Sequence, residues 1–181
     1  MSSLIPSVRS MLAATPARWT ALAGVDAALL ARPPAPGEWS AFQCLRHVVD
    51  TEAGVFRARV TAIRDGRDFA AFDPDAQGST AAAGGSMDEL AAAFVDLRAG
   101  SLAMLDGVSA EDLGRTARHA ELGPVTLREL LSQWAAHDTM HVVQAERALM
   151  QAFIPGSGPW RFYFADHDVE MPATGSASTH G

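Results

Sequence analysis

The stretch that decides the fold is 126-TLRELLSQWAAHDTMHVVQAERALM-150. It opens with Thr126 followed three residues later by Glu129, a capping box that satisfies free backbone N–H groups at the start of a helix. Apolar residues then recur at helical spacing on one face: Leu127, Leu130, Leu131, Trp134, Ala145, Ala148 and Leu149. Neither proline nor glycine interrupts the stretch before Pro155. The sequence therefore predicts a long helix that begins at Thr126 and ends before Pro155.

Two upstream segments begin in the same way, with a serine followed three residues later by Gln or Glu. The pairs are Ser40–Gln43 and Ser86–Glu89, and the helices that they open are predicted over residues 40–66 and 86–107. Residues 66–85 are rich in Asp, Gly, Ala and Ser, which favours a long crossover loop between these two helices.

The N-terminal segment is predicted to contain the remaining helix. Thr15-Pro16 has the pattern of an N-cap followed by proline at the first helical position, and the helix then runs to about Leu30. Residues 4–12 add a short extra turn or a kinked extension. Three prolines within residues 32–37 end the helix. Together, the segments predict an all-α fold, a four-helix bundle with a long crossover loop.

The ends of the chain and the 109–125 segment complete this organisation. One short helical turn is predicted near residues 109–112, and residues 115–125 are expected to be extended and loop-like. Aromatic residues at 160–164 are expected to pack back on the bundle. We therefore predict one domain over residues 1–165 and a flexible C-terminal tail over residues 166–181.

Composition narrows the function classes. The net charge of −7 argues against a protein that binds the phosphate backbone of nucleic acids, because such a protein needs a basic patch. No apolar run approaches the roughly 20 residues that span a bilayer, and Pro6 and Arg9 interrupt any signal-peptide core. Cys44 is the one cysteine, so no internal disulfide forms. A cytoplasmic protein is expected.

Two histidines carry the chemistry of the 126–150 helix. His137 and His141 are four residues apart, which places both imidazoles on one side of the helix, one turn from each other. This spacing lets two side chains bind one metal ion. The alternative is that both are core histidines whose nitrogens bond to protein groups.

His47 supplies a third imidazole from the 40–66 helix, on the ridge that also carries Cys44, Val48 and Thr51. Three interior histidines are costly to leave unpaired, and one metal ion satisfies all three. Three neutral nitrogen ligands with open positions are typical of a catalytic metal site. Imidazole suits zinc, nickel, copper or iron, and zinc and nickel are our first expectations.

Other polar residues lie near these three histidines in the pattern. Gln144 falls one turn beyond His141 and could orient a ligand of the metal, or bond to a neighbouring element. Asp138 could hold a ligand imidazole, although pairing with an arginine is the commoner role. Glu52 is expected to point away from the ridge. Cys44 is a possible fourth ligand, but a small core residue is the more common role of a buried cysteine.

The string His137-Asp138-Thr139-Met140-His141 differs from the zinc-protease motif H-E-x-x-H. Asp138 stands where that motif has its catalytic glutamate, and no third histidine follows at Arg147. A metalloprotease is therefore not predicted. The remaining histidines lie in predicted loops or the tail and are expected to be unrelated to the metal: His119, His167 and His180.

Four short blocks together resemble the DinB-like family of bacterial proteins. They are Pro36-Gly37-Glu38-Trp39-Ser40, Leu45-Arg46-His47-Val48, Val125-Thr126-Leu127-Arg128-Glu129-Leu130-Leu131 and His137-Asp138-Thr139-Met140-His141-Val142-Val143-Gln144. The resemblance covers about residues 5–155. It implies a four-helix bundle, often dimeric, whose metal triad falls on His47, His137 and His141, the residues that spacing also selects.

Three functions compete, and the resemblance implies only the first, because relatives include S-transferases and isomerases that use low-molecular-weight thiols. The first is a metal-dependent S-transferase that uses a low-molecular-weight thiol such as mycothiol or bacillithiol, in stress or detoxification. The second is a metal-dependent hydrolase of a small molecule, with Gln144 or Asp138 positioning water. The third is a non-enzymatic metal-binding or interaction protein. An S-transferase should also have an arginine for the carboxylates of its cosubstrate, and Arg57, Arg59 and Arg161 are the candidates.

Overall fold

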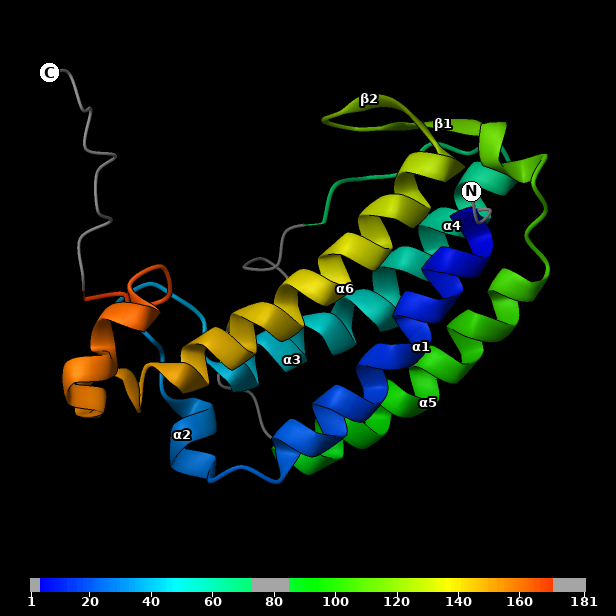
Figure 1. Ribbon diagram of the computed structural model, residues 1–181. Coiled ribbons are helices and arrows are strands. Elements are labelled where there is room, and N and C mark those ends of the chain that lie inside the picture. Colours follow the sequence, from blue (N-terminus) through cyan, green and yellow to red (C-terminus); the bar gives the residue numbers. More distant parts are fainter. Residues whose placement is uncertain (1–3, 73–84, 171–181) are drawn as a thin grey trace, which may run out of the picture.

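The computed structural model describes residues 4–72 and 85–170, and four long helical segments dominate it (Figure 1). The first segment is α1 (Leu4–Ala23). The second is built from α3 (Ala41–Thr51), a π-helical turn (Glu52–Phe56) and α4 (Arg57–Arg64). The third and fourth are α5 (Met87–Asp106) and α6 (Leu127–Met150).

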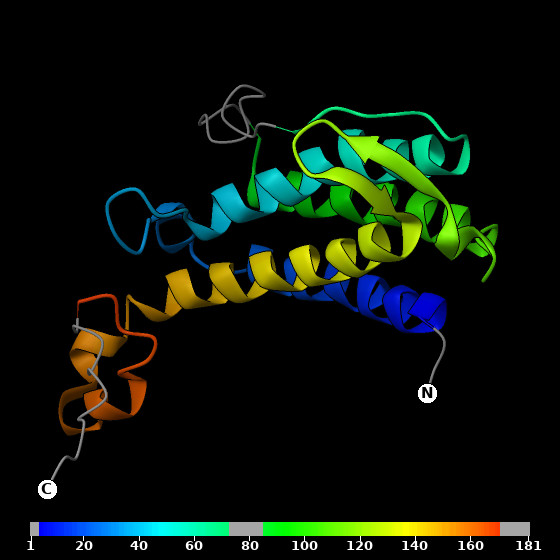
Figure 2. The same ribbon diagram turned by 90° about the horizontal axis from the view of Figure 1, so that it is seen from above.

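These segments form one bundle in which each helix touches two neighbours. Helix α1 packs against α5 and α6, and α3 packs against the same two helices, so α1 and α3 lie at opposite corners (Figures 1 and 2). Two clusters of buried apolar side chains fill the interior, one around Trp134 and the other around Trp19. The predicted all-α, four-helix-bundle fold is confirmed.

The three predicted capping boxes are present. In each box the side chain of the N-cap residue accepts a hydrogen bond from the backbone N–H three residues on, and the Gln or Glu at that position accepts one from the N-cap backbone. The pairs are Ser40–Gln43 before α3, Ser86–Glu89 before α5 and Thr126–Glu129 before α6. The starts of three of the four segments are therefore encoded locally.

The start predicted for the first helix is wrong. Helix α1 begins at Leu4 and continues through Pro16, and Thr15 lies inside it rather than capping it. Proline in a helix normally leaves the carbonyl four residues before it without a partner. Here the Leu12 carbonyl accepts hydrogen bonds from Arg98 Nη1 at 2.6 Å and from the Thr15 hydroxyl, so the helix tolerates the proline.

The end of that helix also differs from the prediction. Helix α1 stops at Ala23, and a separate short helix, α2 (Ala27–Ala31), follows. The Asp26 side chain caps α2 by accepting hydrogen bonds from the backbone N–H groups of Ala28 and Leu29. This local cap starts a new helix in a changed direction.

Residues 115–125, predicted as a loop-like extended segment, form a β-hairpin. Strand β1 (Thr116–His119) pairs antiparallel with β2 (Gly123–Thr126), and a short 3₁₀ turn (Asp112–Gly114) precedes them. The first residues of the predicted crossover loop lie beside the hairpin, because the Phe69 N–H donates a hydrogen bond to the Arg118 carbonyl. Residues 73–84 of that loop lie outside the described residues. The hairpin is thereby held next to α4.

A buried ion-pair network joins all four segments. Arg98 on α5 is 1% exposed, and its guanidinium bonds to Glu52 (2.7 Å from Nε) and to Asp138 (2.9 Å from Nη2). Glu52 also accepts a hydrogen bond from Trp134 Nε1. Glu52 was expected to point away from the ridge that carries His47; it lies outside the histidine cluster, but its side chain is buried in the core. The π-helical turn begins at Glu52, where the side chain enters the core.

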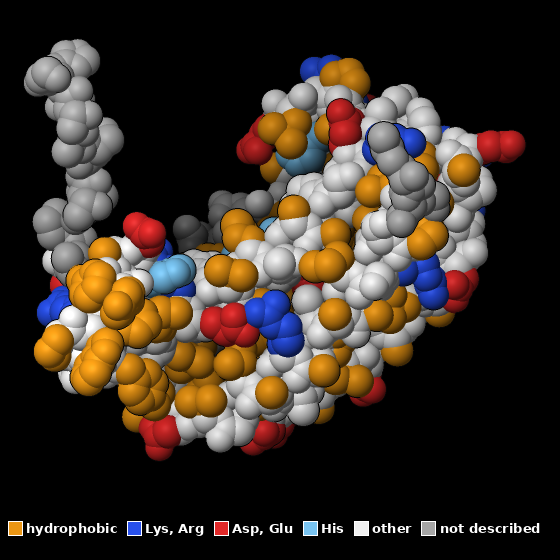
Figure 3. Space-filling model, in the orientation of Figure 1, with side chains coloured by type: hydrophobic (Ala, Val, Ile, Leu, Met, Phe, Trp, Pro, Cys, Tyr) orange, Lys and Arg blue, Asp and Glu red, His pale blue; other side chains and the backbone are white. Residues whose placement is uncertain are grey.

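The C-terminal segment also departs from the prediction. A 3₁₀ segment (Ile154–Phe164) follows α6. Three of its aromatic residues are 63–69% exposed instead of packing on the bundle: Trp160, Phe162 and Tyr163. Figure 3 shows hydrophobic side chains gathered at this end of the molecule.

The flexible tail was predicted to start at residue 166, but His167 and Asp168 form hydrogen bonds and an ion pair with the preceding residues. Gln151, the C-cap residue of α6, donates from Nε2 to the His167 carbonyl at 2.9 Å, and Asp168 is buried and pairs with Arg161 at 2.6 Å. Residues 171–181 lie outside the described residues. Among residues 4–72 and 85–170, no helix is long and apolar enough to cross a membrane.

Candidate metal centre

The structure brings His47, His137 and His141 together between α3 and α6. One nitrogen from each ring lies within 4.8 Å of the others, and the three could hold a metal ion. Nε2 of His47 lies 3.1 Å from Nε2 of His137. His47 and His141 are 5% exposed, so the cluster is largely buried.

This spacing fits a shared metal ion. With Zn–N bonds of about 2.0–2.1 Å, two imidazole nitrogens on one tetrahedral ion lie roughly 3.3 Å apart. The 3.1 Å between His47 Nε2 and His137 Nε2 is close to that value. In addition, the Nδ1 atoms of His47 and His137 are buried and have no hydrogen-bond partner among the described residues. The facing Nε2 atoms are therefore the ones positioned to bind an ion, and each buried Nδ1 points away from it.

Aromatic side chains wall the centre. Trp39 stacks on His141 with ring centroids 5.7 Å apart, Phe56 meets the edge of His137, and Phe72 lies against His47. Burial lowers the pKa of His47 to about 4 and that of His137 to about 3, and the positive charge of a protonated His141 adds to both effects. Burial also lowers the pKa of His141. The rings are therefore neutral, the form that binds metal.

The low pKa values predict that the metal-free protein loses stability on mild acidification. The unfolded chain takes up protons near pH 6.5, whereas His47 and His137 stay neutral in the folded state down to about pH 4 and pH 3. The contribution of these histidines to the free energy of unfolding is therefore fully present above pH 6.5. It is lost as the pH falls toward 4, by at most about 1.4 kcal/mol per histidine per pH unit.

Urea unfolding of the metal-free protein at pH 7, 6 and 5 measures this effect. Substituting both histidines with glutamine should flatten the dependence between these pH values. A wild-type unfolding free energy that stays constant from pH 7 to pH 5 would contradict buried neutral imidazoles.

Gln144 orients His141. Its Oε1 atom lies 2.9 Å from Nδ1 of His141, one turn back along α6. Since an amide oxygen only accepts, the proton of the neutral ring sits on Nδ1 and Nε2 is left free to bind a metal. The structure shows Gln144 in contact with the imidazole of His141 rather than with a neighbouring element.

Replacing Gln144 with leucine should weaken Zn²⁺ binding roughly 10- to 100-fold, as loss of a group that orients a metal ligand commonly does. Leucine has a similar size but cannot accept the Nδ1 proton. Competition with a chromophoric chelator gives the affinity, and Ser132→Leu, at an exposed position of the same helix outside both cavities, is the control. Equal affinities of wild type and Gln144→Leu would show that the contact does not tune the centre.

The other predicted polar candidates lie in the core. Asp138 pairs with Arg98, as expected for the commoner role of such a residue, and it also accepts from Thr15. Cys44 is fully buried, burial raises its pKa to about 12, and it is not in the metal-binding group found among the described residues. A thiol in this state is a core residue rather than a redox group.

A cavity of about 280 Å³ opens beside His47 and His137. Helices α3, α4 and α6, the start of the crossover loop and the hairpin enclose it. Its lining includes Thr51, Phe56, Arg59, Phe72, His119, Glu121 and Gln133. On the far side of the cluster, Trp39, His141 and Gln144 line a second cavity of about 600 Å³.

His119, which was expected to lie in a loop and to be unrelated to the metal, lines the cavity. It is 7% exposed and lies at the end of β1, facing the same cavity as His47 and His137. Only the pairing of the hairpin and its contact with Phe69 bring it there. No local sequence pattern signals this placement.

Of the three arginines considered for a carboxylate, Arg59 alone lines this cavity. The Arg57 guanidinium lies against Gly100 of α5, and Arg161 pairs with Asp168 and Glu170. His167 is exposed near the end of the described chain, and His180 lies outside the described residues.

Comparisons with known proteins agree with the fold. The sequence matches the model of the DinB superfamily over residues 11–145. The structure is similar to that of YfiT from Bacillus subtilis, described as a probable metal-dependent hydrolase with an unusual four-helix bundle topology. The TM-score is 0.70 at 18% identity, and the alignment covers 82% of this chain and 87% of YfiT. No curated protein matches the sequence significantly.

The family match spans most of the helical bundle and includes His47, His137 and His141. The bundle topology and the matched residues together establish that this chain belongs to the DinB superfamily.

Proposed function

We propose that the protein is a metal-dependent S-transferase that binds one divalent ion, zinc or nickel, through His47, His137 and His141. Held by these three imidazoles, such an ion would lower the pKa of a small thiol, which would release its proton to water and be present as thiolate at neutral pH. The thiolate then attacks an electrophilic carbon, a C–S bond forms, and the leaving group departs with its electron pair.

The observation that carries this proposal is the nature of the donor set. Within the described part of the chain, the group that could hold a metal ion consists of three histidines and no carboxylate. The nearby buried carboxylates, Glu52 and Asp138, are both committed to Arg98. A thiol is far more acidic than water, so its activation depends less on a general base.

The cavity beside the histidines supports a small-molecule reaction. Its volume of about 280 Å³ is close to the lower end of ordinary ligand pockets. Phe56 and Phe72 shield one side of it from water, and Arg59 provides positive charge on another. A reaction on a small molecule needs a cavity beside the three rings, whereas a purely structural or interaction role does not require one.

A metal-dependent hydrolase is the second candidate. YfiT is described as a probable metal-dependent hydrolase. In this chain Glu121, an exposed residue at the hairpin turn, lines the cavity and is the carboxylate there that can take a proton from water. Under this alternative, activity requires Glu121 and no thiol.

Transfer assays distinguish the two functions. Metal-loaded protein is mixed with monochlorobimane and one of several thiols: mycothiol, bacillithiol, coenzyme A or cysteine. We expect one thiol to react faster with enzyme than without it, and we expect a chelator or His47→Ala to remove the acceleration. Glu121→Gln should leave the rate unchanged.

Two results would count against the S-transferase. One is the absence of acceleration with every thiol. The other is thiol-independent hydrolysis of ester or amide test substrates that Glu121→Gln abolishes, and this result would establish the hydrolase.

A further inference from the structure

We propose that Arg59 and His119 form a subsite for an oxyanion, a carboxylate of the small molecule that reaches the metal centre. The inference deepens the proposed function by naming a chemical group of its ligand, and it rests on that function for the role of the neighbouring histidines. Its own evidence is the geometry of two side chains that come from α4 and β1.

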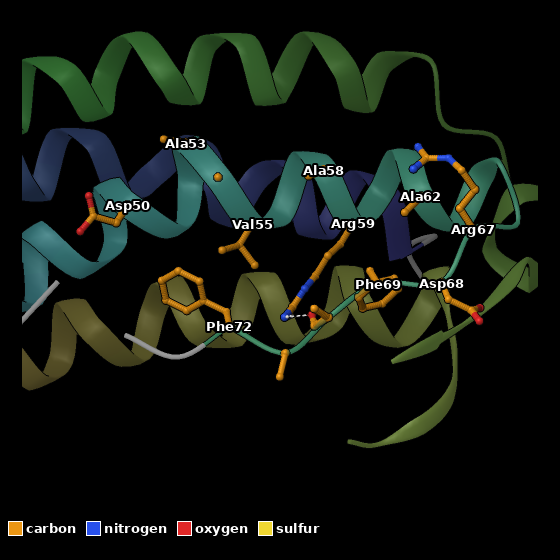
Figure 4. A pocket seen from close by; sticks show the side chains of 13 residues that line it. Asp50, Ala53, Val55, Ala58, Arg59, Ala62, Arg67, Asp68, Phe69 and Phe72 are labelled. Atoms are coloured by element: carbon orange, nitrogen blue, oxygen red, sulfur yellow. Dashed lines mark hydrogen bonds between the residues drawn. The ribbon is translucent and has the colours of Figure 1, made fainter. Parts of the chain in front are cut away.

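Arg59 reaches across the cavity wall from α4. Its Nη2 atom donates to the Ala70 carbonyl at 3.1 Å, and its guanidinium lies 5.3 Å from the centre of the Phe69 ring. Figure 4 shows the side chain extending from the helix toward the 68–72 segment. No described carboxylate forms an ion pair with Arg59, although the side chain is half-buried. Burial lowers its pKa, so an anion beside it would offset the cost of the buried charge.

Hydrogen bonds from the hairpin turn determine which ring nitrogen of His119 carries the proton. Its Nδ1 atom accepts hydrogen bonds from the backbone N–H groups of Glu121 at 3.1 Å and Leu122 at 3.3 Å. An Nδ1 that accepts carries no proton, so the ring proton is on Nε2 and this atom donates. The ring is also held edge-on against Phe69. His119 therefore presents a fixed N–H donor to the cavity.

Two donors then face each other with no acceptor between them, since the Ala70 carbonyl uses only one of the two N–H bonds of Arg59 Nη2. Arg59 Nη2 and His119 Nε2 are 3.5 Å apart. The Arg59 guanidinium has no lone pair to accept a bond, and His119 Nε2 carries its proton there. An anionic oxygen that accepts from both atoms resolves this arrangement with two charge-assisted or strongly polarised hydrogen bonds.

The position of this pair suits a ligand that also reaches the metal centre. Arg59 and His119 line the same cavity as His47 and His137. Arg59 and Phe72 also border a groove of about 560 Å³ along α4, seen in Figure 4, so the subsite lies where the groove meets the cavity. A small thiol with a carboxylate a few bonds away can place its sulfur at the centre and its carboxylate at Arg59.

The test uses protein loaded with Co²⁺, in which a bound thiolate gives a charge-transfer absorption band. Mercaptocarboxylates with one to three methylenes are titrated beside the mercaptoalcohols of equal length. In wild type, the best acid should bind roughly 10- to 100-fold more tightly than its alcohol. Arg59→Met should remove this preference and leave the affinity for the alcohol unchanged.

Two matched variants sharpen the result. His119→Asn keeps an oxygen for the backbone N–H groups of the turn but lacks the Nε2 donor, so it should lose part of the preference. Arg57→Met removes an arginine from the same helix away from the cavity and should retain all of it. Thermal unfolding by circular dichroism checks that each variant is folded.

The outcomes separate this inference from the proposed function. Equal affinities of wild type for acid and alcohol would overturn the subsite while keeping the thiol-binding metal centre. If no thiol produces the charge-transfer band, the S-transferase proposal fails, and calorimetric titration with succinate decides the subsite. Binding by wild type but not by Arg59→Met would support the subsite, and no binding by either protein would overturn it.

Discussion

Replacing His137 with alanine should weaken Zn²⁺ or Ni²⁺ binding by on the order of 1,000-fold or more. The loss should exceed the roughly 10- to 100-fold effect of removing a group that only orients a ligand. His137 supplies one of three ring nitrogens within 4.8 Å of one another, and its Nε2 lies 3.1 Å from that of His47. Two remaining imidazoles hold a divalent ion much less well than three.

The affinity is measured by competition with a chromophoric chelator. His167→Ala is the matched control, because His167 is exposed and is not one of the three histidines of the cluster. Similar losses in both variants would mean that the ion binds nonspecifically to surface histidines. Unchanged affinity in His137→Ala would remove this residue from the site.

Replacing Arg98 with methionine should destabilise the fold by about 3–5 kcal/mol, the range for removal of one partner from a buried ion pair. Arg98 is 1% exposed and forms ion pairs with both Glu52 and Asp138. Methionine fills part of the space but leaves two buried carboxylates without their cation. It also removes a donor to the Leu12 carbonyl, the group that Pro16 leaves unpaired within α1.

Urea unfolding of the metal-free variant measures this loss. Adding Glu52→Gln and Asp138→Asn to Arg98→Met should restore part of the stability, since neutral amides are less costly to bury than unpaired carboxylates. As a surface control, Arg67→Met should change stability by less than about 1 kcal/mol, because its pairing with Asp65 is exposed. If Arg98→Met were as mild as Arg67→Met, the network would not be a major contributor to stability.

Local sequence signals predict the parts of the fold that depend on local chemistry. The capping boxes at Ser40, Ser86 and Thr126 locate three helix starts because the hydrogen bonds involved span only three residues. The spacing of His137 and His141 predicts their proximity for the same reason, and the interior ridge that carries His47 predicts the third member.

The features that the sequence does not predict depend on contacts between distant residues. Thr15-Pro16 has the pattern of a helix start, but Arg98, more than eighty residues away, supplies the bond that lets α1 continue. Glu52 enters the core because Arg98 is there to meet it. In both cases a long-range partner overrides the local preference.

The cavity residues illustrate the same limit. His119 reaches the cavity because a hairpin pairs over only four residues on each strand and because Phe69 bonds to that hairpin. Short strands without an alternating apolar pattern leave little signal in the sequence. The sequence also does not predict that Trp160 and the neighbouring aromatic side chains are exposed. Apolar composition alone does not show whether another surface of the protein is available to pack against them.

The most direct test of the account is the location of the ion in crystals of protein loaded with Zn²⁺ or Ni²⁺. Anomalous difference maps on either side of the metal absorption edge identify the element and its position. The account predicts one strong peak within bonding distance of nitrogens from His47, His137 and His141, with an open side toward the cavity of Arg59 and His119. Peaks confined to other residues, or no peak between the three rings, would contradict it.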